Sequence, residues 1–142
     1  MKKVYVGMAG IIQKADKFLI LKRSPDKDFT PSTWEPVTGR LKSDEDPKEG
    51  IIREIEEEAN LKAEVLLPIE TGFFYRGGKE FPMVFIIYWC KYLDGEVKLS
   101  WEHTEFKWLT LEEILAEPNM ELFHPAYKKI SQFQKTLPKD FI

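Results

Sequence analysis

The stretch GRLKSDEDPKEGIIREIEEEANL, residues 39–61, decides the fold because an acidic loop leads directly into a strongly signalled helix. Asp46 is a good N-cap, Pro47 suits the first helical position, and Glu49 is placed to complete a capping box. Asn60 ends the helix, since Asn tolerates the left-handed conformation that follows a helix C-terminus. Four apolar residues share one arc of roughly 100° and predict the buried face: Ile51, Ile52, Ile55 and Ala59.

Three glutamates lie beside this apolar face in an electrostatically unfavourable arrangement. Glu54, Glu57 and Glu58 repel one another at helical spacings, by roughly 0.2–0.5 kcal/mol for each pair. Acids in the last turn also oppose the helix dipole, and Arg53 relieves only one of them, Glu57, at i+4. Acidic runs are usually solvent-exposed helix faces. An arrangement of charges that costs free energy locally, however, is typical of a functional site. A divalent cation would turn the repulsion into attraction, and carboxylate oxygens suit Mg2+ or Mn2+.

The EF-hand is the other common motif in which an acidic loop meets a helix. Here Asp44, Glu45 and Asp46 are consecutive rather than alternating, and the central turn glycine is missing. Because an EF-hand needs both features to wrap its ion, a calcium site of that kind is excluded.

Composition and charge describe an ordinary globular chain of 142 residues. Its net charge of -3 is too small for the basic face of an electrostatic nucleic-acid binder. Cys90 is the only cysteine, so no intramolecular disulfide is possible and a reducing compartment fits. The longest apolar run, Phe81–Cys90, is about half the roughly 20 residues that a membrane helix needs. We expect a single domain over residues 1–142 in the cytoplasm, with no nucleic-acid or membrane partner.

Segments rich in β-branched and large apolar residues predict strands on both sides of the helix. Thr110 with Glu113 makes a capping box for a second helix, which runs to about Ala116, and Pro125 begins a third helix that Pro138 stops. Strands and helices are interspersed without regular alternation, so we predict the α/β class, with a mixed sheet sandwiched by helices. The predicted strands are residues 4–13, 18–23, 34–38, 63–67, 72–75, 81–92, 97–99 and 106–109.

Taken together, residues 39–61 resemble the signature of the Nudix hydrolase superfamily. Gly39 is followed after five residues by Glu45, and after seven more by the run Arg53–Glu58, REIEEE. The family pattern has a glycine where Asn60 stands, and both residues take the left-handed cap conformation. The resemblance implies a Nudix-like α/β/α sandwich with a mixed sheet.

The resemblance also implies roles for individual residues. Glu54, Glu57 and Glu58 would bind the divalent cations, with Glu54 or a neighbour helping to deprotonate water. Arg53 would orient these carboxylates, and Gly39 would offer its backbone carbonyl to the metal. The predicted catalytic residues are therefore Arg53, Glu54 and Glu57.

A second segment, SWEHTEFKWL at residues 100–109, resembles the place where many Nudix enzymes carry one more glutamate. Glu102 is the predicted extra metal ligand or base, with Glu105 as the alternative. His103 is expected to be a surface or hydrogen-bonding histidine, because magnesium-type sites prefer oxygen. Together with Pro36–Gly39, this segment resembles the branch of dihydroneopterin triphosphate and dATP diphosphatases.

Two arginines and a run of aromatic residues are the candidates for the substrate end of the site. Arg23 and Arg40 could contact phosphates, which a guanidinium binds bidentately, although either could be an ordinary surface charge. Phe73 and Tyr75, with Phe74 between them, are predicted to stack on a base or pterin ring, with burial in the core as the alternative.

The sequence thus predicts a hydrolase that uses Mg2+, or Mn2+ as a substitute, to cleave a diphosphate linkage in a nucleoside-diphosphate-type substrate. A (deoxy)nucleoside or pterin triphosphate giving a monophosphate and pyrophosphate fits this reading. The alternatives are a non-catalytic nucleotide-binding module of the same fold and a diphosphate isomerase. The complete acidic set argues against the module, and an isomerase would need further protonating residues. A monomer and a homodimer are both compatible with the sequence.

Overall fold

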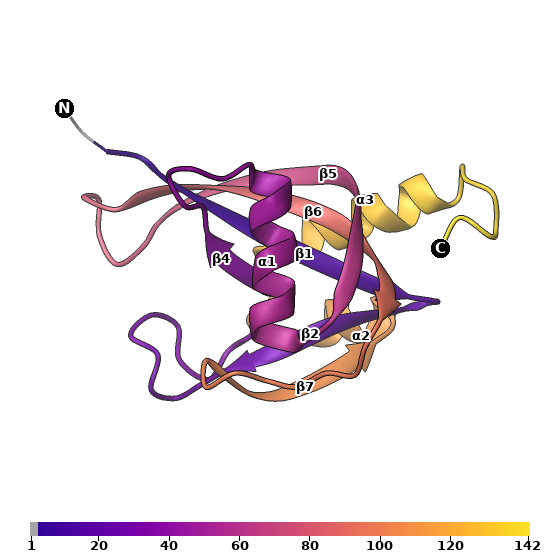
Figure 1. The fold of residues 1–142 in the computed structure, drawn as a ribbon, viewed down its shortest axis with the longest axis horizontal. Helices are drawn as coiled ribbons and strands as arrows, with labels where there is room; N and C mark the ends of the chain where they lie inside the picture. Colours follow the sequence, from indigo (N-terminus) through magenta and orange to yellow (C-terminus); the bar gives the residue numbers. More distant parts are fainter. Residues whose placement is uncertain (1–2) are drawn as a thin grey trace.

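The computed structural model describes residues 3–142 and contains seven strands and three helices (Figure 1). The apolar runs on either side of residues 39–61 become the strands, and the predicted central helix forms where its caps place it. The strands are β1 (Tyr5–Lys14), β2 (Lys17–Arg23), β3 (Trp34–Glu35), β4 (Val37–Arg40), β5 (Lys62–Tyr75), β6 (Pro82–Asp94) and β7 (His103–Leu109). The helices are α1 (Pro47–Ala59), α2 (Leu111–Ala116) and α3 (His124–Gln134).

The sheet is mixed, and β1 lies at its centre. β1 pairs in parallel with β6 and antiparallel with both β2 and β4. The main path through the sheet is β3-β2-β1-β6-β5, with β7 added against β2. The pairing of β2 with β7 places the end of β2 beside the start of β7, and β4 pairs with β1 where α1 crosses the sheet (Figure 1).

Two separate hydrophobic cores cover the two faces of the sheet. Alternate residues of β1 point to opposite faces, so Met8 and Ile12 pack with Ile51 and Ile55 of α1. The other face packs against α2 and α3 through Ala9, Ile11, Trp89, Ile114, Tyr127 and Ile130. The predicted α/β/α sandwich with a mixed sheet is confirmed.

The ends of α1 follow local signals, with one difference from the prediction. The Asp46 side chain accepts a hydrogen bond from the amide of Lys48 at 2.8 Å, so it caps the helix. That bond goes to the second helical residue instead of to Glu49, and the capping box predicted with Glu49 was wrong. Asn60 has φ 59° and its amide bonds the carbonyl of Glu56, as predicted for a left-handed cap. The capping box of Thr110 and Glu113 is confirmed at the start of α2.

Several predicted elements were wrong. The strand predicted over residues 34–38 is two short strands, β3 and β4, and β7 begins at His103 instead of Phe106. Residues 63–67 and 72–75 belong to one long strand, β5, which also includes residues 68–71 between them. Its pairing with β6 shifts register around Val65 and Pro68. Residues 97–99 are not a strand, because the amide of Lys98 bonds the carbonyl of Ala59 and ties this segment to the end of α1. The third helix ends at Gln134, four residues before Pro138. Within residues 3–142, no helix is long and apolar enough to cross a bilayer.

Candidate active site

Arg53 joins the acidic loop to α1. Its guanidinium bonds both carboxylate oxygens of Glu45, at 2.7 and 3.0 Å. The same group donates to Glu54 at 2.9 Å and to Glu57 at 3.1 Å. The bonds from Arg53, with one from the amide of Lys42, lower the pKa of Glu45 to about 2. Arg53 therefore offsets the repulsion among the helical acids and fixes the loop on the helix.

Gly39 makes room for Glu54. A Cβ atom added to Gly39 would overlap the carboxyl group of Glu54, so the close approach of β4 to α1 requires a glycine here. Burial raises the pKa of Glu54, and the guanidinium of Arg53 opposes that rise. Glu54 is thus held between the backbone of β4 and Arg53, with the Gly39 backbone directly beside it.

Glu58 is the most deeply buried acid of α1. Its side chain faces inward, the residue is only 4% exposed, and its Oε2 has no hydrogen-bond partner within residues 3–142. Burial, followed by a hydrogen bond to Glu102, raises the pKa of Glu58 to about 11. That same bond lowers the pKa of Glu102, with help from Lys27 at 3.5 Å. Glu58 and Glu102 therefore form one pair of neighbouring acids, in which each affects the pKa of the other.

The pairing of β2 with β7 brings Glu102 to the helix. The register shifts at the end of β2, so that Lys22 lies opposite Glu105 and Arg23 opposite His103. The amide of Ser24 then bonds the carbonyl of Glu102 at 2.8 Å. Glu105, the alternative in the sequence, lies on the surface and pairs with Lys22 at 3.1 Å. Of the two glutamates, the structure brings Glu102 to Glu58.

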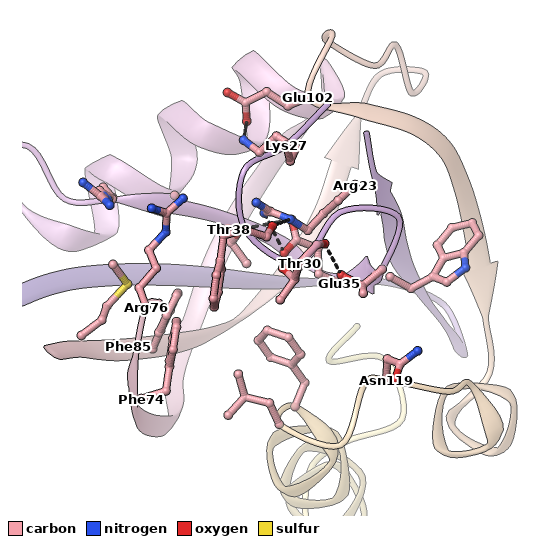
Figure 2. A pocket seen from close by; sticks show the side chains of 18 of the residues that line it. Arg23, Lys27, Thr30, Glu35, Thr38, Phe74, Arg76, Phe85, Glu102 and Asn119 are labelled. Carbon is pink, nitrogen blue, oxygen red and sulfur yellow. Dashed lines mark hydrogen bonds and ion pairs between the residues drawn. The ribbon is translucent and has the colours of Figure 1, made fainter. Parts of the chain in front are cut away.

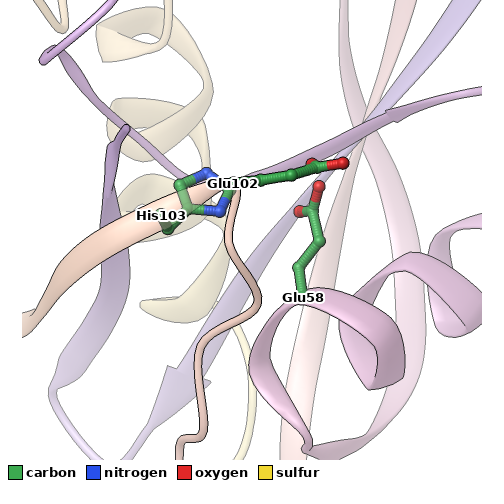
Figure 3. A group of neighbouring side chains, drawn as sticks. All are labelled: Glu58, Glu102 and His103. Carbon is green, nitrogen blue, oxygen red and sulfur yellow. The ribbon is translucent and has the colours of Figure 1, made fainter. Parts of the chain in front are cut away.

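A buried polar network borders this pair of acids. His103 is 4% exposed, and its Nε2 lies 2.9 Å from Oε2 of Glu35. Glu35 also accepts bonds from Arg23, at 3.1 and 3.2 Å, and from the hydroxyl of Thr38. One ligand atom each from Glu58, Glu102 and His103 lie within 4.8 Å of one another, and Figure 3 shows these side chains together.

Sequence reasoning missed Glu35. Its signal was a charged residue between Trp34 and Pro36 in a short strand that leads into the acidic loop. Because Lys, Glu, Arg and Asp are almost never fully buried without a partner, a buried Glu35 required a nearby cation. Arg23 is that cation, and its bonds to Glu35 and to the carbonyl of Phe29 use much of its donor capacity.

The acids open into a cavity of about 660 Å³. One part of its wall consists of carboxylates, and another part carries aromatic rings (Figure 2). The Phe74 ring stacks on Phe29 at 5.8 Å between centroids and on Phe85 at 5.1 Å. The predicted residues that line the cavity are Arg23, Gly39, Arg40, Glu54, Glu58 and Glu102.

Other predicted residues lie outside the cavity wall. The side chain of Glu57 is 56% exposed and contacts Arg53 from the outer side. Phe73 and Tyr75 are also exposed and pack on each other at 5.3 Å. Because side chains alternate along a strand, these two rings point away from the face of β5 that carries Phe74. The ring that faces the cavity is therefore the middle one of the run.

The donor set of this acidic cluster fits a divalent cation. Glu58 has an unpartnered buried oxygen, Glu102 lies beside it, and the Gly39 backbone adjoins Glu54. Hard divalent ions bind such oxygen ligands, and their positive charge would offset the repulsion between these acids. The site is accordingly a candidate metal centre beside a ring-lined cavity.

Comparison with known proteins identifies the family of the chain and some of its relatives. The NUDIX domain family matches residues 1–131 of the chain. The chain belongs to the Nudix family. The bis(5'-nucleosyl)-tetraphosphatase (asymmetrical) of Caenorhabditis elegans is 32% identical over 136 residues, which cover 92% of this chain and 91% of that protein. The nucleoside triphosphatase NudI of Escherichia coli is 28% identical over 116 residues, 74% of this chain and 81% of that one.

The fold of this Nudix protein also matches solved structures. The MutT protein from Methanosarcina mazei Go1 superposes with a TM-score of 0.83 at 26% identity, over 94% of this chain and 97% of that one. The predicted family, fold class and enzyme class are thereby confirmed, and the chain is a Nudix pyrophosphohydrolase. The resemblance to the dihydroneopterin triphosphate branch stays a prediction.

Proposed function

We propose that this Nudix protein hydrolyses a diphosphate linkage in a nucleoside polyphosphate, with Mg2+ or Mn2+ held by Glu54, Glu58 and Glu102. The observation that carries the proposal is that one cavity joins the cluster of carboxylates to a stack of aromatic rings. A polyphosphate with an attached base offers the matching parts, an anionic chain for the cation site and a flat ring for the aromatic wall.

Divalent cations, when bound, neutralise phosphate charge and make water more acidic. The chain's own residues have separate tasks. Arg53 holds Glu54 in place through the bonds described above, and Gly39 leaves the space that Glu54 occupies. Glu102 or Glu54 accepts the proton of the attacking water. The water oxygen bonds to phosphorus while the bridging oxygen–phosphorus bond breaks, and the leaving phosphate departs with the electron pair of that bond.

The positive side chains around the cavity would bind the phosphate chain outside the cation site. Arg40, Arg76 and Lys27 line the cavity. Lys27 already pairs with Glu102, and Arg76 pairs with the exposed Asp28 at 3.2 Å. Arg40 is the best candidate among them, because its guanidinium faces only a ring, that of Tyr5 at 5.3 Å, in the contacts of the described residues.

The names of the relatives limit the substrate class. One relative is a bis(5'-nucleosyl)-tetraphosphatase and another a nucleoside triphosphatase. Both substrates carry a base, a sugar and a run of phosphates, which fits the cavity proposed here. We therefore infer a nucleoside triphosphate or a dinucleoside polyphosphate as the substrate. A pterin triphosphate also joins a flat ring to a run of phosphates, although it has no sugar, and it is the third candidate.

A non-catalytic module and an isomerase would behave differently from a hydrolase in an assay. A binding module would keep nucleotide affinity without turnover, and an isomerase would change a diphosphate substrate without releasing phosphate. The buried, mutually repelling acids favour a catalytic protein, because a site without catalytic activity would gain stability by losing these acids. The cost of keeping Glu58 next to Glu102 thus supports the hydrolase.

A panel assay tests the proposal. Nucleoside triphosphates, dinucleoside tetraphosphates, nucleotide sugars and pterin triphosphate are incubated with the protein and Mg2+. The nucleotide and pterin products are separated by chromatography, and released phosphate and pyrophosphate are measured in the same samples. We expect at least one nucleoside polyphosphate to be cleaved and the reaction to stop with EDTA. Tight nucleotide binding without product from any compound would favour the binding module instead. The single domain, the cytoplasmic location and the choice between monomer and homodimer remain predictions.

A further inference from the structure

His103 has one ring nitrogen engaged and one free. Its Nε2 lies 2.9 Å from a carboxylate oxygen of Glu35, whereas its Nδ1 is buried and has no partner within residues 3–142. The residue is 4% exposed, so solvent does not satisfy that nitrogen. A buried polar atom without a partner costs free energy, typically about 1–3 kcal/mol. The free nitrogen is therefore open to a ligand from outside the protein chain.

Glu35 decides which nitrogen carries the proton. Its carboxylate accepts two hydrogen bonds from Arg23, and a carboxylate only accepts hydrogen bonds. The Nε2 atom must therefore be the N–H donor toward Glu35. In the neutral ring this leaves Nδ1 with a lone pair and no proton. The lone pair belongs to a side chain that reaches the two acids Glu58 and Glu102.

The three side chains and Glu35 have the composition of a mixed metal site. Glu58 and Glu102 offer oxygens, His103 offers a nitrogen, and one ligand atom from each lie within 4.8 Å of one another. Histidines that bind metals usually donate their other N–H to a carboxylate, which fixes the ring and its tautomer. Glu35, anchored by Arg23, holds that position here. Imidazole nitrogen suits Zn2+ or Ni2+ better than Mg2+.

We propose that Nδ1 of His103, oriented by Glu35, is a metal ligand that gives the Glu58–Glu102 site a preference for transition-metal cations over Mg2+. This inference rests on the proposed metal-dependent function and names the class of cation that the same site selects. The oxygen ligands alone would accept Mg2+, as the sequence suggests. The nitrogen adds affinity for ions such as Zn2+, and Glu35 acts as a positioning residue for that nitrogen.

The chain offers a direct readout, because it contains only two histidines, His103 and His124. Protein with isotope-labelled imidazole nitrogens is titrated with Zn2+ and, separately, with Mg2+ while the NMR shifts of both rings are followed. Before metal is added, His103 should show a protonated Nε2 and an unprotonated Nδ1. Zn2+ should then move the Nδ1 signal of His103 and leave His124 unchanged. This experiment uses wild-type protein, so it does not depend on whether a variant folds.

Substitutions give the affinities. His103→Gln should weaken Zn2+ binding by at least about tenfold in calorimetry, with much less change for Mg2+. Glu35→Gln, which keeps the shape of the side chain, should lower Zn2+ affinity by about 10–100-fold through loss of the oriented ring. His124→Gln is the matched control and should bind both ions as the wild type does.

The outcomes separate this inference from the function on which it rests. If Mg2+ binds and substrate is hydrolysed, but Zn2+ leaves the His103 nitrogens unmoved, the nitrogen ligand is wrong and the hydrolase stands. An unchanged ratio of Zn2+ to Mg2+ affinity in His103→Gln would also overturn it. If no divalent cation binds and no nucleotide is cleaved, both proposals fail.

Discussion

Glu58→Gln exchanges the buried acid of α1 for a neutral amide of nearly the same shape. Without metal, burial and then the bond to Glu102 raise the pKa of Glu58 from 4.5 to about 11. At pH 7 the folded protein therefore holds a proton that the unfolded chain releases. The amide needs no proton and can still donate to Glu102. Removing the acid should stabilise the metal-free fold while destroying part of the cation site.

The magnitude follows from linkage. Glu58 takes up a proton when the chain folds at pH 7, because its pKa in the unfolded chain is 4.5. This protonation costs about 1.4 kcal/mol for each pKa unit between 4.5 and 7, so its upper limit is about 3 kcal/mol. Any folded pKa well above 7 gives the same limit. Because the folded pKa is raised, the stability that Glu58 contributes is fully present below about pH 4.5 and falls as the pH rises. Metal-free Glu58→Gln should lose this part of the pH dependence.

Thermal unfolding in EDTA at several pH values between 5 and 9 measures the effect. Glu58→Gln should raise Tm by about 2–4 °C for each kcal/mol gained, and the difference from the wild type should grow with pH. Glu56→Gln, an exposed acid on the same helix, is the matched control and should change Tm little. Turnover with saturating Mg2+ should fall at least about 100-fold in Glu58→Gln. Even the loss of a residue that only hydrogen-bonds to a metal ligand lowers metal affinity or activity about 10–100-fold. A variant that is less stable than the wild type, or nearly fully active, would refute this reasoning.

Four further predictions concern the rest of the site. Glu102→Gln should lower kcat by the roughly 10²–10⁴-fold that a positioned base contributes, whereas Glu105→Gln should be nearly silent in the same steady-state assay. Arg53→Lys keeps the charge but loses the planar two-point grip on Glu45, so kcat should fall about tenfold or more. Phe74→Ala should raise KM by roughly 5–150-fold with a smaller change in kcat, because stacking contributes about 1–3 kcal/mol per base. Millimolar Mg2+ or Mn2+ should raise the Tm of the wild type, because the ion binds the folded state.

Each of these has a result that counts against it. A loss of kcat in Glu105→Gln but not in Glu102→Gln would transfer the role to Glu105. Full activity in Arg53→Lys would mean that its charge alone suffices. A larger rise in KM for Phe73→Ala than for Phe74→Ala would favour the exposed ring that the sequence suggested. A melting curve unaffected by divalent cations would contradict the metal site.

The sequence predicted α1 well because its signals are local. Asp46 and Asn60 lie at the two ends of the helix, and each acts through its own backbone neighbours. The spacing of the apolar residues then determined the buried face, and with it which acids lie near the core. Glu58 lies on that inner side and Glu57 does not, yet both fit the same motif. How deeply Glu58 is buried depends on the segments that pack over it. The spacing of residues along the helix carries no information about those segments.

The rest of the site depends on contacts between distant segments. Glu102 meets Glu58 because β7 pairs with β2, and only the resemblance, not a local signal, pointed to Glu102. Alternation predicts that Phe73 and Phe74 point to opposite faces, but the sheet around β5 decides which face borders the cavity. Glu35 gains its role from Arg23 and His103, which lie 12 and 68 positions away in the sequence. No periodicity or local motif signals such a pairing.

We propose that the acids of this cavity direct water to a phosphorus of a nucleoside polyphosphate. Phosphorus NMR of the reaction in water enriched in the heavy oxygen isotope tests it most directly, with Mg2+ present and again with EDTA. We expect the heavy isotope to enter one phosphate-containing product, labelled product to form only with the metal, and Glu58→Gln to form almost none. Product without the label, or labelling that continues unchanged in EDTA, would contradict this role of the acids and the metal.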